Sequence, residues 1–180
     1  MASTTFRRAA GAAAVLCAGC SSTQQTVPDV VPASLRAPAS QLMTLKAHAT
    51  GAQVYECRQA KDDPSRFVWT LKAPDASLVD EAGRKVAKHY AGPTWEASDG
   101  STVVAEVVAR EPSPDPKAIP WLLLKANQTT GHGQFSTVKS IQRLHTVGGL
   151  APDACTASQA GRELRVKYSA DYYFYVGSGS

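Results

Sequence analysis

Short stretches in which apolar and polar residues alternate run through most of the chain, and turn-forming residues separate them. A period of two is the pattern of β-strands with one buried face. From Phe67 to Lys72 two aromatic residues and a leucine alternate with Val68, Thr70 and Lys72, and Val103–Arg110 alternates in the same way. The stretches that we expect to form strands are Gln41–Ala49, Gln53–Arg58, Phe67–Lys72, Lys85–Tyr90, Val103–Arg110, Trp121–Ala126, Ser140–Val147, Glu163–Tyr168 and Tyr172–Val176.

Turn signals are frequent and helix signals are scarce. We expect turns at Thr50-Gly51, Asp80–Gly83, Ser98–Ser101 and Gly148-Gly149, where Gly, Asp and Ser gather. No long window keeps a helical period of apolar residues without a Gly or Pro, and residues 75–82 would form one helical turn at most. The pattern therefore predicts an all-β fold with little helix, either an antiparallel sandwich or a barrel-like domain.

The N-terminal region has the composition of an export signal. Arg7 and Arg8 precede the apolar run Ala9–Ala18, which is too short to cross a bilayer as a helix. Gly19-Cys20 resembles the end of a bacterial lipobox, although Cys17 stands where Leu is usual. We expect a lipoprotein-type signal peptide over residues 1–19 and lipidation at Cys20. A plain secretory signal, or a cytoplasmic protein with an unusual start, is the alternative.

The organisation after the signal follows from composition. Residues 20–34 are rich in Ser, Thr, Gln, Val and Pro, and we expect a flexible tether there. Residues 35–177 are expected to form a single β domain. After removal of the signal, Cys57 and Cys155 remain besides Cys20, and in an oxidising compartment they would form one disulfide. Two buried free thiols are the alternative, and a nucleophilic or metal-binding cysteine pair would need a motif that is missing.

The charge excludes one class of partner. The formal net charge of the whole chain is +4, and two of its basic residues, Arg7 and Arg8, would leave with the signal. The remaining basic residues are scattered instead of forming a stripe with aromatic platforms, so we expect no nucleic acid partner. The expected partners are a membrane, through the lipid anchor, and a polysaccharide or small-molecule ligand.

One segment concentrates residues with binding chemistry. His89, Tyr90, Trp95 and Glu96 flank the strand-breaking pair Gly92-Pro93, and Asp99 follows. These side chains would gather at one bend, where aromatic rings could stack on a sugar or another small polar ligand and His and Glu could form hydrogen bonds. The alternative is ordinary packing, with Tyr90 and Trp95 in the core and His89 and Glu96 as their neighbours.

Several segments resemble one protein family. They are Val54–Cys57, Phe67–Trp69, His89–Glu96, Ile119–Leu123, Ile141–Leu144, Gly148-Gly149 with Ala151-Pro152, and Ala170–Tyr175. Their order is similar to that of the bacterial and fungal domain of unknown function 3455 (DUF3455), over roughly Pro32 to Tyr175. The resemblance implies an exported protein and assigns no catalytic residue.

Other site chemistries find little support. His48, His89, His132 and His145 are far apart and form no metal-binding motif, so we expect no metal. Gly131-His132-Gly133 is not continued as a dinucleotide-binding loop, and we expect no cofactor. A Ser-His-Asp triad is neither indicated nor excluded.

Three functions remain open from the sequence. The leading hypothesis is a non-enzymatic binding domain in the cell envelope, facing the periplasm or the exterior. The second is a secreted hydrolase acting on carbohydrate or ester substrates, with Glu96 or Asp99 as acid or base and His89 assisting. The third is a purely structural envelope protein, favoured if the bend is packed solid. A carboxyl group with a raised pKa in a closed cleft would indicate the enzyme, and an aromatic face with ordinary carboxylates would indicate binding.

Overall fold

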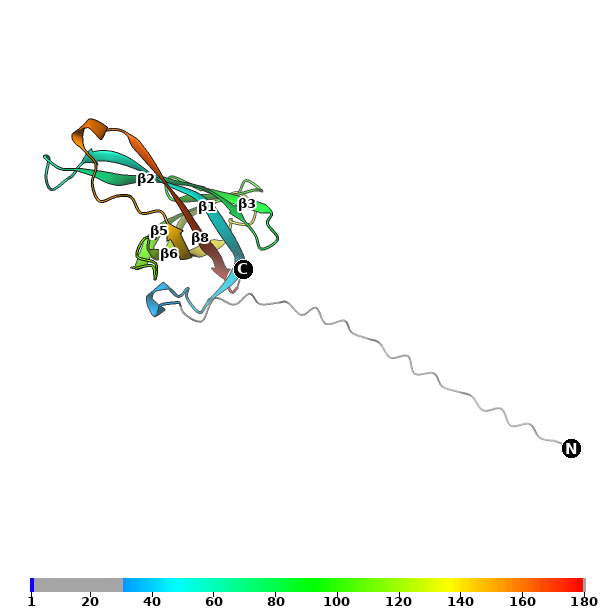
Figure 1. Cartoon of the computed structure of the whole chain (residues 1–180). Helices are drawn as coiled ribbons and strands as arrows, with labels where there is room; N and C mark the ends of the chain where they lie inside the picture. Colours follow the sequence, from blue (N-terminus) through cyan, green and yellow to red (C-terminus); the bar gives the residue numbers. More distant parts are fainter. Residues whose placement is uncertain (2–30, 180) are drawn as a thin grey trace.

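Eight antiparallel strands close into a barrel (Figure 1). The computed structural model describes residue 1 and residues 31–179, so residues 2–19 of the expected signal peptide, Cys20 and most of the expected tether lie outside the described residues. The strands are β1 (Gln41–Gln59), β2 (Phe67–Val79), β3 (Lys85–Tyr90), β4 (Thr94–Ala97), β5 (Thr102–Glu111), β6 (Trp121–Thr130), β7 (Val138–Gly148) and β8 (Glu163–Gly177). Two short 3-10 helices, η1 (Ala33–Leu35) and η2 (Ala157–Gln159), complete the described elements. The prediction of an all-β fold is confirmed, and of the two predicted architectures, a sandwich and a barrel, the barrel is the one observed.

The barrel closes because β1 pairs with strands from both ends of the sheet. One edge of β1 pairs with β2, where His48 is opposite Val79, and the other pairs with β8, where His48 is opposite Asp171. All other pairs join strands that are neighbours in the sequence. Closure leaves each strand with one inner and one outer face, which explains the alternation in the sequence.

The expected turn at Thr50-Gly51 is wrong, because β1 runs through it without a break. Gly51 is needed for a close approach between strands. A Cβ atom at this position would lie 2.2 Å from the Asp75 carbonyl oxygen of β2 and 2.5 Å from the Ala76 Cα. Glycine inside a strand therefore marks contact between backbones here, and not a change of direction. The helical turn considered over residues 75–82 is also wrong, because β2, the strand opposite Gly51, extends to Val79.

Aromatic side chains fill the barrel. Trp95, Tyr172, Phe135 and Phe174 are almost completely buried and belong to one hydrophobic cluster. Phe135 comes from the segment between β6 and β7 and stacks on Phe174, with 4.6 Å between the ring centroids. Its backbone N–H donates to Ser101 Oγ at 3.0 Å, which holds this segment against the β4–β5 turn.

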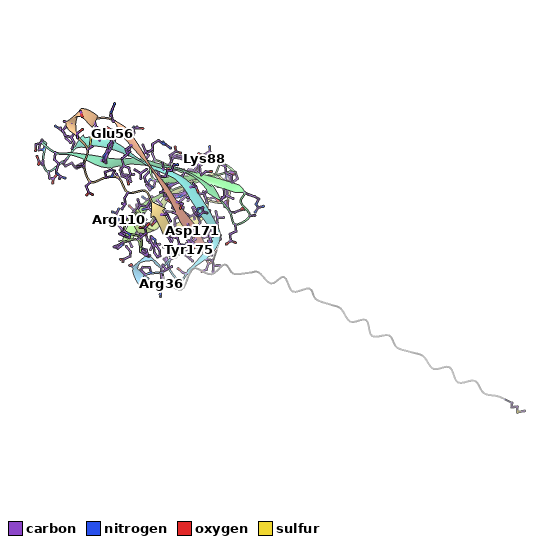
Figure 2. All side chains as sticks on the ribbon, viewed as in Figure 1. Arg36, Glu56, Lys88, Arg110, Asp171 and Tyr175 are labelled. Atoms are coloured by element: carbon purple, nitrogen blue, oxygen red, sulfur yellow. A yellow bond between two sulfur atoms is a disulfide. The ribbon has the colours of Figure 1, made fainter. Side chains whose placement is uncertain are left out.

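A second, smaller cluster lies on the outer face of the barrel. Tyr173 and Tyr175 of β8 point to the side opposite Tyr172 and Phe174, and they pack with Val31, Leu35, Trp121 and Leu144. The Tyr175 hydroxyl donates to Gln142 Oε1 at 2.5 Å, and Gln142 Nε2 donates to the Leu35 carbonyl at 2.5 Å. Figure 2 labels Tyr175 on β8 and Arg36 just after η1. The chain around η1 therefore covers the aromatic face of β8.

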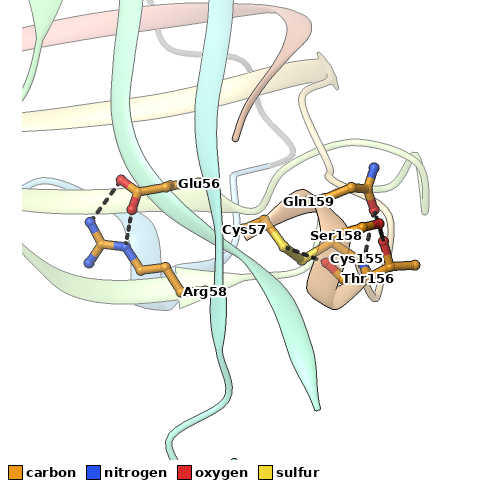
Figure 3. Close-up of a disulfide and its surroundings, with 7 residues drawn as sticks. All are labelled: Glu56, Cys57, Arg58, Cys155, Thr156, Ser158 and Gln159. Atoms are coloured by element: carbon orange, nitrogen blue, oxygen red, sulfur yellow. Dashed lines mark hydrogen bonds and ion pairs between the residues drawn. A yellow bond between two sulfur atoms is a disulfide. The ribbon is translucent and has the colours of Figure 1, made fainter. Parts of the chain in front are cut away.

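The expected disulfide between Cys57 and Cys155 is confirmed (Figure 3). It joins β1 to the segment before η2 across a sequence separation of 98 residues. The Gly161 N–H donates to the Cys57 carbonyl and the Cys57 N–H to the Arg162 carbonyl, each at 2.9 Å. The bond and these contacts attach the segment between β7 and β8 to the outer part of β1, while Glu56 and Arg58 point away from the disulfide.

Candidate ligand-binding site

The β3–β4 hairpin divides the predicted site residues between two faces of the sheet. His89 lies opposite Trp95 and Lys88 opposite Glu96, with Gly92 at a φ of 123° in the turn. Because neighbouring residues in a strand point to opposite sides, His89 and Trp95 face the barrel interior while Glu96 faces outward. The structure thus brings these residues to one bend, as expected, but does not place them in a single group.

On the inner face, His89 and Trp95 form a stacked pair. Their ring centroids are 4.1 Å apart with an interplanar angle of 7°, and Tyr172 contacts both rings edge-on at 5.4 and 5.5 Å. His89 Nδ1 is 2.9 Å from the Thr94 carbonyl oxygen. A carbonyl can only accept, so Nδ1 carries the proton and Nε2 presents a lone pair. Burial lowers the pKa of His89 to about 3, and the imidazole is neutral at physiological pH.

On the outer face, Tyr90 and Glu96 interact with each other. The Tyr90 hydroxyl donates to Glu96 Oε2 at 3.0 Å, and this bond raises the pKa of the phenol. Lys88 Nζ lies 4.0 Å from Glu96 Oε1. These side chains are accessible to solvent, where such pairs contribute little to stability.

Asp99 is separate from both groups and organises the turn before β5. Its carboxylate accepts hydrogen bonds from the Ser101 hydroxyl at 2.6 Å, the Ser101 N–H at 2.9 Å and the Gln134 N–H at 2.8 Å. These bonds hold the pKa of Asp99 below its usual value, and the bond from the Ser101 hydroxyl has the largest effect. Asp99 therefore ties the β4–β5 turn to the segment that carries Phe135.

A cavity of about 280 Å³ lies beside the His89–Trp95 pair. Its deep side is formed by buried residues, including Gln53, His89, Trp95 and Tyr172. Its mouth is formed by more exposed residues, among them Leu71 at 53% and Val107 at 43% exposure. The complete lining is Gln53, Leu71, Lys72, Ala73, Pro74, His89, Gly92, Pro93, Trp95, Val107, Arg110, Leu122, Leu124, Arg143 and Tyr172.

The short β3–β4 hairpin explains why the barrel wall opens at this position. β2 pairs with β3 only from Ala76 to Val79, and β5 pairs with β4 only from Thr102 to Val104. Leu71–Pro74 of β2 and Val107 of β5 lie beyond these pairs and border the mouth together with the hairpin turn. The wall is thus interrupted where the hairpin ends, and the cavity opens there.

Unpaired polar atoms are concentrated in this lining. Among the described residues, five buried side-chain N or O atoms lack a hydrogen-bond partner, and three of them belong to the lining: Gln53 Nε2, Trp95 Nε1 and the Tyr172 hydroxyl. Tyr168 lies next to Tyr172 without a hydrogen bond of good geometry, and burial raises its pKa. Buried polar groups are normally paired. These three atoms have almost no accessible surface, so they lie behind the cavity wall and not on its surface.

No Asp or Glu lines the cavity in the part of the chain that the structure describes. The shifted carboxyl groups Glu56, Asp63, Asp80 and Asp99 all have lowered pKa values, each chiefly through a side-chain hydrogen bond. Glu96 and Asp99 also lie away from the buried imidazole of His89. The arrangement suits recognition by aromatic faces and hydrogen bonds better than proton transfer by a carboxyl group.

The four histidines considered for a metal do not all come together at one place. His48 and His145 both contact Asp171, with Nδ1 to carboxylate distances of 2.9 and 3.0 Å, while His89 is inside the barrel. Within residues 31–179, no group of three His, Cys, Asp or Glu side chains is arranged to hold a metal ion. The same residues contain no helix that is long and apolar enough to cross a membrane.

Sequence reasoning missed most of the cavity lining. Gln53 and Arg143 each lie in a strand with no binding or catalytic motif around them, and only the closed sheet places them beside His89. Tyr172 belongs to an expected strand, and its position beside the cavity depends on the pairing of β7 with β8. The available signal was the conspicuous hairpin with Trp95, which does contribute four lining residues: His89, Gly92, Pro93 and Trp95.

Together, fold and cavity define a small antiparallel β-barrel with a side cavity whose deep side is largely aromatic. The model of a family described as "Protein of unknown function (DUF3455)" matches residues 38–176, and the chain belongs to this family. Searches found no matching curated protein and no matching solved structure.

Proposed function

We propose that this protein is an exported binding protein that holds one small molecule in the cavity of its barrel. The observation that supports the proposal most is the cavity of about 280 Å³ beside the His89–Trp95 stack. Eight-stranded barrels of other proteins hold single small ligands in this way. An apolar lining with a few fixed polar groups is typical of such sites.

The lining favours a particular kind of ligand. The rings of His89, Trp95 and Tyr172 make the deep side of the cavity aromatic and apolar, and the lone pair of His89 Nε2 offers one acceptor. A volume of about 280 Å³ suits a small molecule or a single sugar unit better than a long polysaccharide. Binding is preferred over hydrolysis because no carboxylate of the described residues reaches this lining.

We also propose that the protein acts in the cell envelope, anchored by a lipid on Cys20 after removal of residues 1–19. The disulfide between Cys57 and Cys155 supports an oxidising compartment. Release without an anchor is the alternative. Mass spectrometry of the mature N-terminus tests the proposal: a diacylglyceryl group on Cys20 is the expected result, and an unmodified start at another residue would contradict it.

A pair of valine variants tests the cavity. Val107 lines the mouth and is 43% exposed, while Val108 is outside this lining and 52% exposed. We expect Val107→Trp to fill the mouth and Val108→Trp to leave it open. Titration with N-phenyl-1-naphthylamine, a neutral apolar fluorophore, should show binding to the wild-type protein and to Val108→Trp but at least about tenfold weaker binding to Val107→Trp. Equal binding by both variants would place the probe elsewhere and contradict the proposal.

A further inference from the structure

A cross-strand row of four residues runs through the cavity wall from β5 to β8. Arg110 of β5 is opposite Leu122 of β6, Leu122 is opposite Arg143 of β7, and Arg143 is opposite Tyr172 of β8. Residues opposite each other on neighbouring strands share a face of the sheet. All four line the cavity, so two arginines flank Leu122 on the inner face. Figure 2 labels Arg110 on its strand.

Neither arginine has a carboxylate partner among the described residues. The Arg143 guanidinium donates from Nε and Nη2 to the Pro120 carbonyl, at 3.2 and 2.9 Å, and it is partly buried. Arg110 is exposed at the mouth, and none of the described ion pairs includes it. Lys72, the third cation in the lining, differs because it pairs with Glu163 at 2.5 Å.

The local electrostatics are positive for a structural reason. The charge of Arg143 reaches two groups near it. Burial is the main cause of the lowered pKa of His89, and the Arg143 charge lowers it further. Burial raises the pKa of Tyr168, and the Arg143 charge acts in the opposite direction. The neutral His89 adds no charge, and no Asp or Glu of the described residues lines the cavity. Arg143 therefore has hydrogen bonds but no counter-ion among the described residues, and an anion in the cavity would supply one.

We propose that the ligand of this cavity is a small organic anion, whose acidic group lies over Leu122 between Arg110 and Arg143 and whose apolar body lies against His89 and Trp95. This inference rests on the proposed function, because it names the chemical class that the same cavity accepts. Guanidinium groups bind carboxylate, sulfonate and phosphate oxygens through paired N–H donors. β5 and β7 each lie about 4.8 Å from β6, so Arg110 and Arg143 are on either side of an acidic group that lies over Leu122.

Two fluorophores that differ by one acidic group test the charge. N-phenyl-1-naphthylamine is neutral, and 8-anilinonaphthalene-1-sulfonate carries the same rings with a sulfonate. We expect the disulfide-intact protein to bind the sulfonate at least about tenfold more tightly than the neutral probe. Added salt should reduce this preference and leave binding of the neutral probe unchanged.

Arginine variants test whether the preference for the sulfonate probe comes from Arg110 and Arg143. Arg110→Gln should reduce it several-fold, and Arg110→Gln with Arg143→Gln should abolish it while neutral-probe binding persists. Gln at position 143 keeps a donor for the Pro120 carbonyl. Arg162→Gln is the control, because it removes the same charge from an exposed residue outside the lining.

The outcomes separate the two proposals. Equal affinity for the two probes, or a preference that survives the double variant, would overturn the anion inference and leave the binding function standing. Failure of both probes to bind the wild-type protein, or binding that Val107→Trp does not weaken, would overturn both.

Discussion

The imidazole of His89 lies flat against the indole of Trp95, with 4.1 Å between the ring centroids. The two residues are direct partners in the β3–β4 ladder, so the hairpin itself sets this contact. Their shared face turns toward the interior and forms one wall of the cavity. A local feature of the sequence thereby becomes part of a site that only the closed barrel completes.

Acid should destabilise the protein through His89. The folded-state pKa is about 3 against an ordinary value of 6.5, so between these values the unfolded chain binds a proton that the folded protein does not. The free energy of unfolding then falls as pH falls through this window, by up to about 1.4 kcal/mol per pH unit. Urea denaturation at several pH values, comparing the wild-type protein with His89→Gln, should show a smaller pH dependence in the variant. Parallel curves would show that His89 does not contribute.

Two tryptophans offer a matched comparison. Trp95 and Trp121 are both buried with unpaired Nε1 atoms, but only Trp95 lines the cavity. Trp95→Phe should weaken binding of the naphthylamine probe several-fold, because it removes part of the aromatic wall of the cavity, and Trp121→Phe should leave binding unchanged. Trp95→Ala is unsuitable, since emptying this core position would cost about 3–5 kcal/mol. Equal losses in both Phe variants would instead indicate a general effect on the fold.

Removal of the disulfide should lower stability substantially. The double variant Cys57→Ser with Cys155→Ser releases a constraint across 98 residues. We expect its free energy of unfolding to fall by about 2–5 kcal/mol. Denaturant unfolding of the double variant measures this loss, and a reducing agent should shift the wild-type protein to a similar midpoint while leaving the variant unaffected. A wild-type midpoint that does not respond to reduction would contradict the structural role of the bond.

Two glycines should differ in their tolerance of alanine. At Gly51 a Cβ would meet the Asp75 carbonyl oxygen at 2.2 Å, whereas at Gly83 nothing lies within 4 Å and only the φ of 76° opposes a side chain. We expect Gly83→Ala to cost about 1–2 kcal/mol and Gly51→Ala at least about 2 kcal/mol, because backbone atoms must move. Thermal unfolding ranks the two variants. A smaller loss of stability for Gly51→Ala than for Gly83→Ala would contradict the close approach of β1 and β2 at Gly51.

Alternation and cysteine content were sufficient to predict the all-β class and the disulfide between Cys57 and Cys155. Local signals failed where tertiary contacts decide the outcome. Gly51 indicates a turn when only its neighbours are considered, yet it permits β1 to pass close to β2. No strand was expected at Thr94–Ala97, because a strand of four residues has too few positions to show a period.

The candidate site was predictable only in part, for the same reason. The hairpin at His89 and Trp95 was conspicuous, and simple alternation separates its inner residues from Glu96. The other walls of the cavity come from strands far along the chain, such as Gln53 in β1 and Arg143 in β7. Their approach depends on the pairing of β1 with β8 that closes the barrel, and no local pattern encodes that register.

The indole N–H signals of the three tryptophans provide the most direct test of the cavity as a ligand site. In two-dimensional ¹H–¹⁵N spectra, with the signals assigned through the Phe variants, addition of 8-anilinonaphthalene-1-sulfonate should shift the Nε1–H signal of Trp95 and leave that of Trp121 in place. A Trp95 signal that stays unchanged while the probe binds would contradict the account.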